Sequence, residues 1–405
     1  MLVTLAGLGC GTAATVTAEA REAMLQADCL IGAERLLASL PETCTKRRLP
    51  ATRPQEIFDL LGKVGSQRPC VVYSGDTGFY SGTRGLLPLL EASGMAYRVL
   101  PGISSVQMLA ARLGRPWQDW ALYSAHGTDC DPVTAVSQGR PAFFLTGGSL
   151  GPDGLCRRLA DAGLGELPVT VGENLSYGQE RISRGTAAEL AKQSFAPLSV
   201  LLAEPAPEPF PKRTSGIADA CFQRGTVPMT KQEVRAAALG KLAVRPTDIV
   251  WDVGAGTGSV SVELALAADR GRAYAVECQE EALELIRTNR ERFGAWNLTP
   301  VPGRAPEALE ALPAPDAVFI GGTKGGMEPI VDIALKKNPN ARICISAIAL
   351  ETLTAAVTAL TARGLEAEVT QISVSRTRAA GALHLLMANN PVFLITGRRT
   401  EGTET

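Results

Sequence analysis

The chain carries a glycine-rich loop whose residues are suited to binding a nucleoside. The segment Asp252-Val-Gly-Ala-Gly-Thr-Gly258 follows an apolar run and precedes a helical pattern. Glycines have no Cβ, so a ligand can approach the backbone closely, and amides at the start of a helix can donate hydrogen bonds to it. The acidic residue and the Gly-x-Gly-x-Gly spacing differ from the Gly-x-Gly-x-x-Gly of dinucleotide-binding loops. The loop therefore predicts a sulfonium nucleoside, S-adenosylmethionine, as its ligand.

A second acidic residue is placed to complete this nucleoside site. Glu277 ends the next predicted strand, nineteen residues after Gly258. A carboxylate at that distance can accept hydrogen bonds from both ribose hydroxyls of an adenosine. Glycine-rich turns also occur without any ligand. Here, however, the strand, the loop, the helix and the acidic strand end all fit a nucleoside site.

The elements that must position these residues alternate between strands and helices, which predicts an α/β fold. In the second half, helices are expected at 231–242, 259–268, 280–293 and 351–363, and strands at 248–253, 272–277, 317–320, 341–346, 366–373 and 392–396. In the first half, strands are expected at 2–6, 70–73, 97–100, 141–146 and 198–203, and helices at 18–27 and 86–93. Most of these first-half strands lead into glycine-rich corners, where open α/β sheets place their ligands.

Length and composition bound the class of protein. The chain has 405 residues, 45% of them hydrophobic, and a formal net charge of -1. This length predicts at least two cores, and the neutral charge argues against nucleic acid or an anionic membrane as a partner. The nine cysteines include no Cys-x-x-Cys pair and there are only two histidines, so neither a disulfide framework nor a metal site is expected. The N-terminus has no positive leader and no segment could span a bilayer, so a cytoplasmic location is expected.

A proline-rich segment predicts the domain boundary. In Glu204-Pro-Ala-Pro-Glu-Pro-Phe-Pro211 the alternating prolines exclude regular helix and favour an extended spacer. We expect a first domain at 1–204, a linker at 205–216 and a second domain at 217–397. Residues 398–405 lack apolar content and are expected to form a flexible tail.

Several motifs resemble those of two known families. Val227-Pro-Met-Thr-Lys-Gln-Glu-Val-Arg235, Trp251–Val260 and Phe319-Ile-Gly-Gly322 resemble the decarboxylating precorrin methyltransferases of the cobalamin pathway, which have a Rossmann-like class I fold. Gly7-Leu-Gly9, Ser74–Tyr80, Pro101–Ser105 and Ser124-Ala-His-Gly127 resemble the two-lobed tetrapyrrole methylases, which have a class III fold. The resemblance implies methylation of a precorrin at two carbons with loss of an acetate carboxyl group, and it implies a homo-oligomer.

The resemblance also implies one S-adenosylmethionine site in each domain. In the second domain the implied contacts are Thr230, Gly254, Ala255, Gly256, Thr257, Gly258, Glu277 and Ala305. In the first domain they are Gly7, Gly9, Gly75, Asp76, Gly78, Ser104, Ser105 and Thr146. The first loop commonly contains a proline where this chain has Cys10, which predicts a less rigid loop. Thr230 could also act as a plain helix N-cap, and the two roles could coexist.

A corrin precursor bears many carboxylates, so basic side chains are expected around its cleft. The candidates for substrate binding are Lys231, Arg235, Lys324, Arg376 and Arg378, together with His126, Gly321 and Gly322. Each basic residue could instead be a surface charge, and His126 could be structural. His384 lies between apolar residues and is expected to be partly buried in a core. No catalytic acid or base is assigned, because methyl transfer needs alignment and an electron-rich carbon, and the tetrapyrrole can accept the electrons of decarboxylation itself.

Other functions stay open at this point. The precorrin could carry cobalt or no metal, and the acceptor could instead be an RNA or a protein, because a fold does not choose its substrate. The chain could also be a nucleoside-sensing regulator without turnover. Its lack of a basic, aromatic-rich tract argues against RNA.

Overall fold

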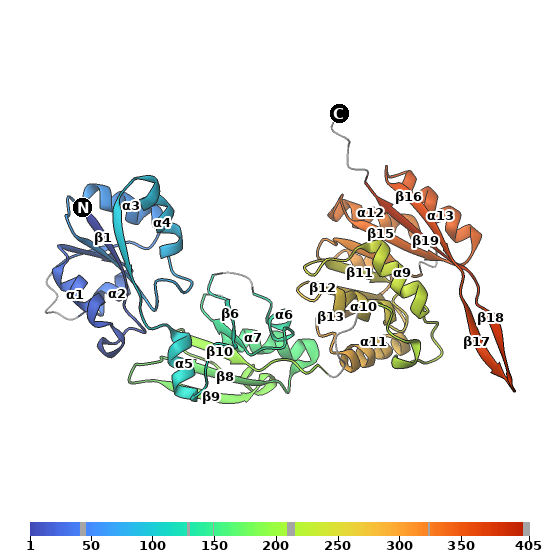
Figure 1. Cartoon of the computed structure of the whole chain (residues 1–405), viewed down its shortest axis with the longest axis horizontal. Coiled ribbons are helices and arrows are strands. Elements are labelled where there is room, and N and C mark those ends of the chain that lie inside the picture. Colours follow the sequence, from blue (N-terminus) through green and yellow to red (C-terminus); the bar gives the residue numbers. More distant parts are fainter. Residues whose placement is uncertain (41–45, 128–129, 149, 209–214, 323–324, 400–405) are drawn as a thin grey trace. The chain divides into compact units, whose positions relative to one another are not determined.

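The computed structural model describes residues 1–40, 46–127, 130–148, 150–208, 215–322 and 325–399 (Figure 1). The internal contacts divide the chain into two units. The first comprises Met1–Cys130, Arg140–Asp161 and Gly165–Glu204, and the second comprises Asp131–Gly139, Ala162–Leu164 and Pro205–Thr405. None of the described helices is long and apolar enough to cross a membrane.

The first unit begins with a five-stranded parallel sheet in the order β3-β2-β4-β1-β5. Its strands are β1 (Leu2–Gly7), β2 (Cys29–Gly32), β3 (Arg47–Pro50), β4 (Pro69–Tyr73) and β5 (Ala96–Leu100), and its helices are α1 (Ala18–Gln26), α2 (Glu34–Ala38), α3 (Pro54–Lys63) and α4 (Thr83–Ala92). Leu30 and Val72 pack against α1 and α2, whereas Ile31 and Val71 pack against α3 and α4. Because helices cover both faces, the strands are continuous apolar runs.

A second sheet completes the first unit, in the order β6-β7-β10-β8-β9. Its strands are β6 (Ala121–Ser124), β7 (Ala142–Leu145), β8 (Pro168–Glu173), β9 (Arg181–Thr186) and β10 (Ser199–Ala203), and the helices of this part are α5 (Ser105–Leu113), α6 (Pro132–Val136), α7 (Pro152–Leu159) and α8 (Ala187–Leu190). Strands β6 and β7 are parallel, and the other pairs are antiparallel. The two sheets give this unit the two α/β lobes that were expected.

The second unit contains a seven-stranded sheet in the order β13-β12-β11-β14-β15-β19-β16. Its strands are β11 (Ile249–Val253), β12 (Arg272–Glu277), β13 (Leu298–Pro302), β14 (Ala317–Ile320), β15 (Arg342–Ala347), β16 (Glu366–Ile372) and β19 (Val392–Arg398), and its helices are α9 (Gln232–Leu242), α10 (Ser259–Ala267), α11 (Glu280–Phe293), α12 (Met327–Lys337) and α13 (Leu350–Thr361). Only β19 runs antiparallel to its neighbours. The strand order reverses between β11 and β14, and such switch points open a crevice at the carboxyl ends of the strands.

The two faces of this sheet are buried by different helices. Trp251 and Val253 share a core with α12 and α13, whereas Val250 packs with α9 and α10. The predicted strands 272–277 and 317–320 and the predicted helix 280–293 have the bounds that the structure shows. Short helical turns are η1 (Ala13–Thr15), η2 (Ala160–Leu164), η3 (Asp219–Cys221) and η4 (Glu307–Leu309).

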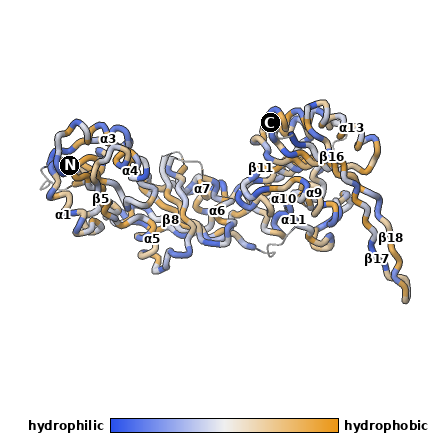
Figure 2. Tube along the Cα trace, turned by 45° about the horizontal axis from the view of Figure 1, so that its top comes forward, coloured by the Kyte–Doolittle hydropathy of each residue, from blue (hydrophilic) through white to orange (hydrophobic). Residues whose placement is uncertain are grey.

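An antiparallel hairpin of β17 (Ser375–Ala380) and β18 (Leu383–Ala388) leaves the sheet between β16 and β19. Both of its strands are exposed, and Figure 2 shows hydrophobic positions along it. The expectation that His384 is partly buried is therefore wrong, because its apolar neighbours lie on an exposed arm and not in a core. Leu386, for example, is 72% exposed.

Two leucines of the first unit test this account of burial. Leu30 in β2 is 0% exposed, and Leu25 in α1 is 55% exposed. We expect Leu30→Ala to lower the free energy of unfolding of this unit by about 2–5 kcal/mol, because it leaves a cavity. The matched change Leu25→Ala should alter it by no more than about 0.5 kcal/mol. Urea unfolding of the full chain measures both, and equal losses would contradict the packing described for β2.

Candidate functional site

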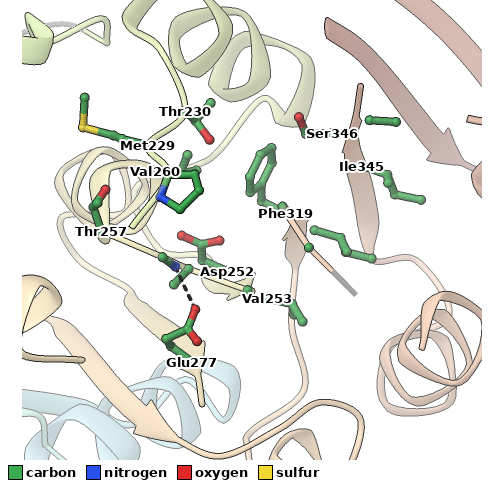
Figure 3. Close-up of a pocket in the computed structure, with 18 of the residues that line it drawn as sticks. Met229, Thr230, Asp252, Val253, Thr257, Val260, Glu277, Phe319, Ile345 and Ser346 are labelled. Atoms are coloured by element: carbon green, nitrogen blue, oxygen red, sulfur yellow. Dashed lines mark hydrogen bonds between the residues drawn. The ribbon is translucent and has the colours of Figure 1, made fainter. Parts of the chain in front are cut away.

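The carboxyl ends of β11, β12, β14 and β15 surround a cavity of about 820 Å³ in the second unit (Figure 3). Its wall includes the predicted donor residues Thr230, Gly254, Ala255, Gly256, Thr257, Glu277 and Ala305 and the predicted substrate residues Lys231, Gly321 and Gly322. Asn389 and Asn390, which follow the hairpin, also line it. The cavity thus lies where the strand order switches between β11 and β14, and residues from distant parts of the sequence line it.

The glycines of the loop after β11 are required by close backbone packing. A Cβ on Gly254 would lie 2.5 Å from the carbonyl oxygen of Gly322, so the loops after β11 and β14 are in direct contact there. Gly254, Gly256 and Gly258 have φ angles of 73°, 55° and 75°, in the left-handed region that favours glycine. Gly258 is the N-cap of α10, and its Cα faces Ile286. Only the first two of these glycines line the cavity.

Glu277 is held in one orientation by backbone amides. Its Oε2 accepts a hydrogen bond of 3.0 Å from the amide of Gly256, drawn in Figure 3, and its Oε1 accepts from the amides of Cys278 and Gln279 at 2.7 and 3.0 Å. The side chain is mostly buried but faces the cavity. A carboxylate fixed in this way is preorganised to accept hydrogen bonds from a ligand.

Asp252 is the most buried acid of the cavity wall. It is 2% exposed, and its Oδ2 accepts a hydrogen bond from the Ser261 hydroxyl, but its Oδ1 has no hydrogen-bond partner among the described residues. Burial raises the pKa of Asp252 to about 7; the Ser261 hydrogen bond opposes this shift, and the charge of Glu277 adds to it. The Thr257 hydroxyl is also buried without a partner in the described structure. Both groups can therefore serve a ligand of the cavity.

Arg235 was predicted to meet the substrate, but it is a buried structural residue. Its side chain is 0% exposed and does not line the cavity. Its guanidinium donates to Glu263 and Asp219, each at 2.9 Å, and to the carbonyl oxygen of Thr230. These bonds leave it no access to a substrate. Arg235 instead fixes the backbone of Thr230, which lies on the cavity wall.

Of the other predicted basic residues that the structure describes, only Lys231 lines the cavity. Lys231 is exposed on the cavity rim, where it is the N-cap of α9, so Thr230 is not the N-cap. Arg376 on β17 pairs with Asp219 and Glu233 at 3.1 and 2.6 Å, away from the cavity lining. Arg378 is exposed on the same strand, and Lys324 lies outside the described residues. Arg376 and Arg378 are therefore hairpin residues and do not line the cleft.

Arg304, which was not predicted from the sequence, lines the cavity beside Ala305. Its side chain is exposed and makes no ion pair with any residue that the structure describes. The residue follows β13, a strand that contains Pro300 and Pro302 and was not predicted. Strand β13 pairs only with β12, and proline is tolerated on such an edge strand. Recognising that edge strand would have pointed to Arg304.

In the first unit, three predicted corners meet through bare backbone. A Cβ on Gly7, at the end of β1, would lie 2.7 Å from the Gly75 oxygen and 2.8 Å from the Gly102 nitrogen. Asp76 ties the corners together, since its Oδ1 accepts from the Gly102 amide at 3.0 Å and its Oδ2 from the Gly78 amide at 2.9 Å. Gly102 was not among the predicted site residues, although it lies in the predicted corner Pro101–Ser105.

The remaining first-unit candidates have local partners. Gly9 forms a bridge with Gly75, and Ser104 forms a capping box at the start of α5, whose first residue is Ser105. The Thr146 hydroxyl donates to the Ser199 oxygen at 2.7 Å in the second sheet. His126 is exposed, and its ring lies against Gly147.

Cys10 stands in the first loop of this unit, at the position where a proline is common. Its thiol donates to the Ile103 oxygen at 3.6 Å, and burial raises its pKa to about 11. The sequence predicted that this first loop is less rigid. In the structure, a hydrogen bond ties it to the corner after β5.

No group of three or more His, Cys, Asp and Glu that could hold a metal ion occurs in the part of the chain that the structure describes. The donor set of the cavity is instead made of backbone amides, carboxylates and hydroxyls. These groups suit an organic ligand with hydroxyl and cationic groups.

Comparison with known proteins covers both halves of the chain. Residues 220–399 match the family described as precorrin methyltransferase domain, and residues 2–191 match tetrapyrrole (corrin/porphyrin) methylases. The chain is 33% identical over 332 residues, 80% of its length and 79% of the relative's, to a precorrin-6Y C(5,15)-methyltransferase [decarboxylating] of Sinorhizobium sp. It is 39% identical over 186 residues, 45% of its length and 96% of the relative's, to a cobalt-precorrin-6B C(15)-methyltransferase (decarboxylating) of Salmonella typhimurium.

Solved structures are also similar to parts of this chain. One of them is a precorrin-6Y C5,15-methyltransferase from Geobacter metallireducens, which is 38% identical, covers 46% of this chain and 100% of its own, and has a TM-score of 0.45.

The contact between Gly254 and Gly322 can be tested by adding one methyl group. We expect Gly254→Ala to weaken S-adenosylmethionine binding to the second unit by at least about tenfold, because its Cβ would displace one loop and its positive φ would be strained. Gly240→Ala is the matched control, since its Cβ would meet nothing within 4 Å in helix α9. Isothermal titration calorimetry measures both affinities. Unchanged binding in Gly254→Ala would contradict the described loop packing.

Proposed function

This chain belongs to the family of decarboxylating precorrin-6Y C(5,15)-methyltransferases, and we propose that it converts precorrin-6Y into precorrin-8X in cobalamin biosynthesis. In this reaction S-adenosylmethionine methylates carbons 5 and 15, and the acetate side chain of ring C loses carbon dioxide. The observation that carries the proposal is a preorganised nucleoside cavity in a chain that matches both families in their fused order.

We assign the two methylations to separate domains. Residues 1–204 would methylate carbon 5, and residues 217–397 would methylate carbon 15 and release carbon dioxide, with 205–216 as linker and 398–405 as tail. The support for the second assignment is that the C(15)-methyltransferase (decarboxylating) of Salmonella typhimurium matches only 45% of this chain but 96% of its own length. Such a relative corresponds to one domain.

S-adenosylmethionine fits the cavity of the second unit. Glu277 presents a carboxylate fixed by three amides, which suits the ribose hydroxyls, and Asp252 and Thr257 offer polar atoms without a described partner. The glycines of the loop leave their backbone open to close approach. In the first unit we propose a second donor site at the contact of Gly7, Gly75 and Gly102, which would make one donor per domain.

The protein's part in the chemistry is positioning and exclusion of water. The donor supplies a methyl group on a sulfonium sulfur, and the tetrapyrrole supplies an electron-rich carbon and takes up the electrons released with carbon dioxide. Phe319 and Ile345 form an apolar wall beside the polar loop (Figure 3), and Ile320 also lines the cavity. An apolar wall excludes water, so no water molecule competes with the acceptor carbon for the methyl group of the sulfonium.

We propose that Lys231 and Arg304 hold the carboxylates of the precorrin. Both line the cavity, both are exposed, and neither forms an ion pair with a described residue. Arg235 and Arg376, in contrast, already neutralise Asp219 and other acids. Unpaired cations on the rim are available to an anionic substrate.

A cobalt-containing precorrin is the second candidate substrate. The relative of Salmonella typhimurium, which matches 45% of this chain, is named for cobalt-precorrin-6B. The relative that matches both domains is named for precorrin-6Y, and this wider match favours the metal-free substrate. Turnover of both compounds by the intact chain decides between them.

We also propose that the chain is cytoplasmic and forms a homo-oligomer. The support for self-association is the exposed hairpin, where Leu383 and Leu386 are 67% and 72% exposed. Exposed apolar patches commonly mark interaction surfaces.

One substitution in the donor loop tests the division of labour. We expect Gly256→Arg to fill the loop of the second unit, so that the intact chain adds one methyl group to precorrin-6Y but releases no carbon dioxide. Mass spectrometry of the product and trapping of labelled carbon dioxide measure the two steps. Undiminished carbon dioxide release would place decarboxylation elsewhere in the chain.

Removal of the two rim cations tests the substrate contacts. We expect Lys231→Ala and Arg304→Ala each to raise KM for the precorrin about tenfold, or ~1.4 kcal/mol, and to leave the affinity for S-adenosylmethionine unchanged. Lys336→Ala, which removes an exposed lysine of α12 outside the cavity lining, is the control. If KM changes as much in the control, the effect comes from general charge and not from contacts on the rim.

A further inference from the structure

The carboxyl group of Asp252 has an unusual position among the ionisable groups of the cavity. Figure 3 shows it pointing into the cavity beside Phe319. Only one of its two oxygens has a described partner, the Ser261 hydroxyl. Its neighbour Glu277 has both oxygens bound by backbone amides. Asp252 is thus an acid in the cavity wall whose free oxygen is left for a ligand or a proton.

The surroundings of Asp252 favour its neutral form when the cavity holds no cation. A buried carboxylate with an unsatisfied oxygen is costly, and a nearby negative charge adds to the cost. Glu277 on β12 carries that charge. Burial of Asp252, together with the charge of Glu277, raises the pKa of Asp252 to about 7, although the hydrogen bond from Ser261 lowers it. The other ionisable groups of the wall, Lys231, Cys278 and Arg304, are exposed on the rim.

Methyl transfer changes the charge of the ligand in such a cavity. S-adenosylmethionine carries a sulfonium, an ammonium and a carboxylate, so its net charge is positive. When the carbon–sulfur bond breaks, the electron pair stays on sulfur, the methyl group bonds to the acceptor carbon, and S-adenosylhomocysteine has no net charge. A positive charge near a buried carboxyl group favours the carboxylate, and its loss favours the proton again.

We propose that Asp252 makes the second domain distinguish the cationic methyl donor from the neutral product by exchanging a proton with solvent. Asp252 releases its proton to solvent when the donor binds, and it takes a proton up when the sulfonium becomes a thioether. The summed charge of ligand and Asp252 is then the same before and after transfer. This inference rests on the donor site proposed above, and it assigns Asp252 a role in donor affinity and product release.

Calorimetric titration of the intact chain in buffers of different ionisation enthalpy measures the protons released on binding. In the Gly256→Arg variant the donor loop of the second unit is filled, so its proton release comes from the first domain. The difference from wild type is the proton release of the second domain. At pH 7 we expect S-adenosylmethionine to release about half a proton in the second domain, because a group with a pKa near 7 is half protonated there. S-adenosylhomocysteine should release much less, and Asp252→Asn should release none with either ligand.

The pH dependence of ligand affinity gives a second test, which compares the affinity for S-adenosylmethionine with that for S-adenosylhomocysteine. The donor needs the carboxylate, so its affinity should fall by about tenfold per pH unit below the pKa and stay constant well above it, while product affinity stays nearly constant. Ser261→Ala provides an independent variant, because loss of a bond that lowers the pKa should shift this fall to higher pH. Its expected effect at pH 7 is a larger proton release on donor binding.

Two results would overturn the inference. One is donor binding without proton release in the second domain, and the other is equal proton release by donor and product. Product formation from precorrin-6Y, followed in parallel, separates this failure from failure of the proposed function: a chain that turns over without proton exchange retains the function and loses only the role of Asp252. A chain whose second domain binds no donor loses both.

Discussion

The second unit depends on the direct contact of the backbone at Gly254 with the backbone at Gly322. This contact brings the loops after β11 and β14 together at the switch of strand order, and no side chain fits between them. The same loop then donates its Gly256 amide to Glu277, which fixes that carboxylate on the neighbouring strand. The first unit uses the same device, since Gly7, Gly75 and Gly102 approach through bare backbone. In both units, close contacts between glycines shape the corners where a donor is proposed to bind.

Arg235 shows how far a side chain's role depends on partners distant in sequence. Its spacing from Lys231 predicted two cations on one cleft, and only Lys231 is there. Asp219 and Glu263 lie 16 and 28 residues from Arg235 in sequence, yet both pair with it in the core. A buried cation without such partners would be strongly destabilising, so these acids decide that Arg235 is structural. Nothing in the local sequence reveals that pairing.

The predictable parts of the fold are those with local causes. Strands β12 and β14 are buried apolar runs that end at glycines or an acid, and their bounds follow from the sequence. Strand β13 escaped notice because its prolines conceal an edge strand, and Arg304 was missed with it. The β17–β18 hairpin also escaped notice, because its apolar residues resemble a core segment although both strands are exposed. The glycine loop and Glu277 were placed on the cavity because their motif alone specifies strand ends, and Lys231 was placed there from its position next to Thr230.

The presence of two sheet-containing units in one polypeptide has a consequence for supply. One translated chain delivers both units in a fixed one-to-one ratio, whatever the level of expression. Tethering also changes the fate of an intermediate, because linked modules meet at a higher effective concentration than separate ones. With the division of labour proposed above, a precorrin released from one unit would be captured by the other before it diffuses away. Such capture would limit loss of the intermediate to solvent even if neither unit changed its own rate.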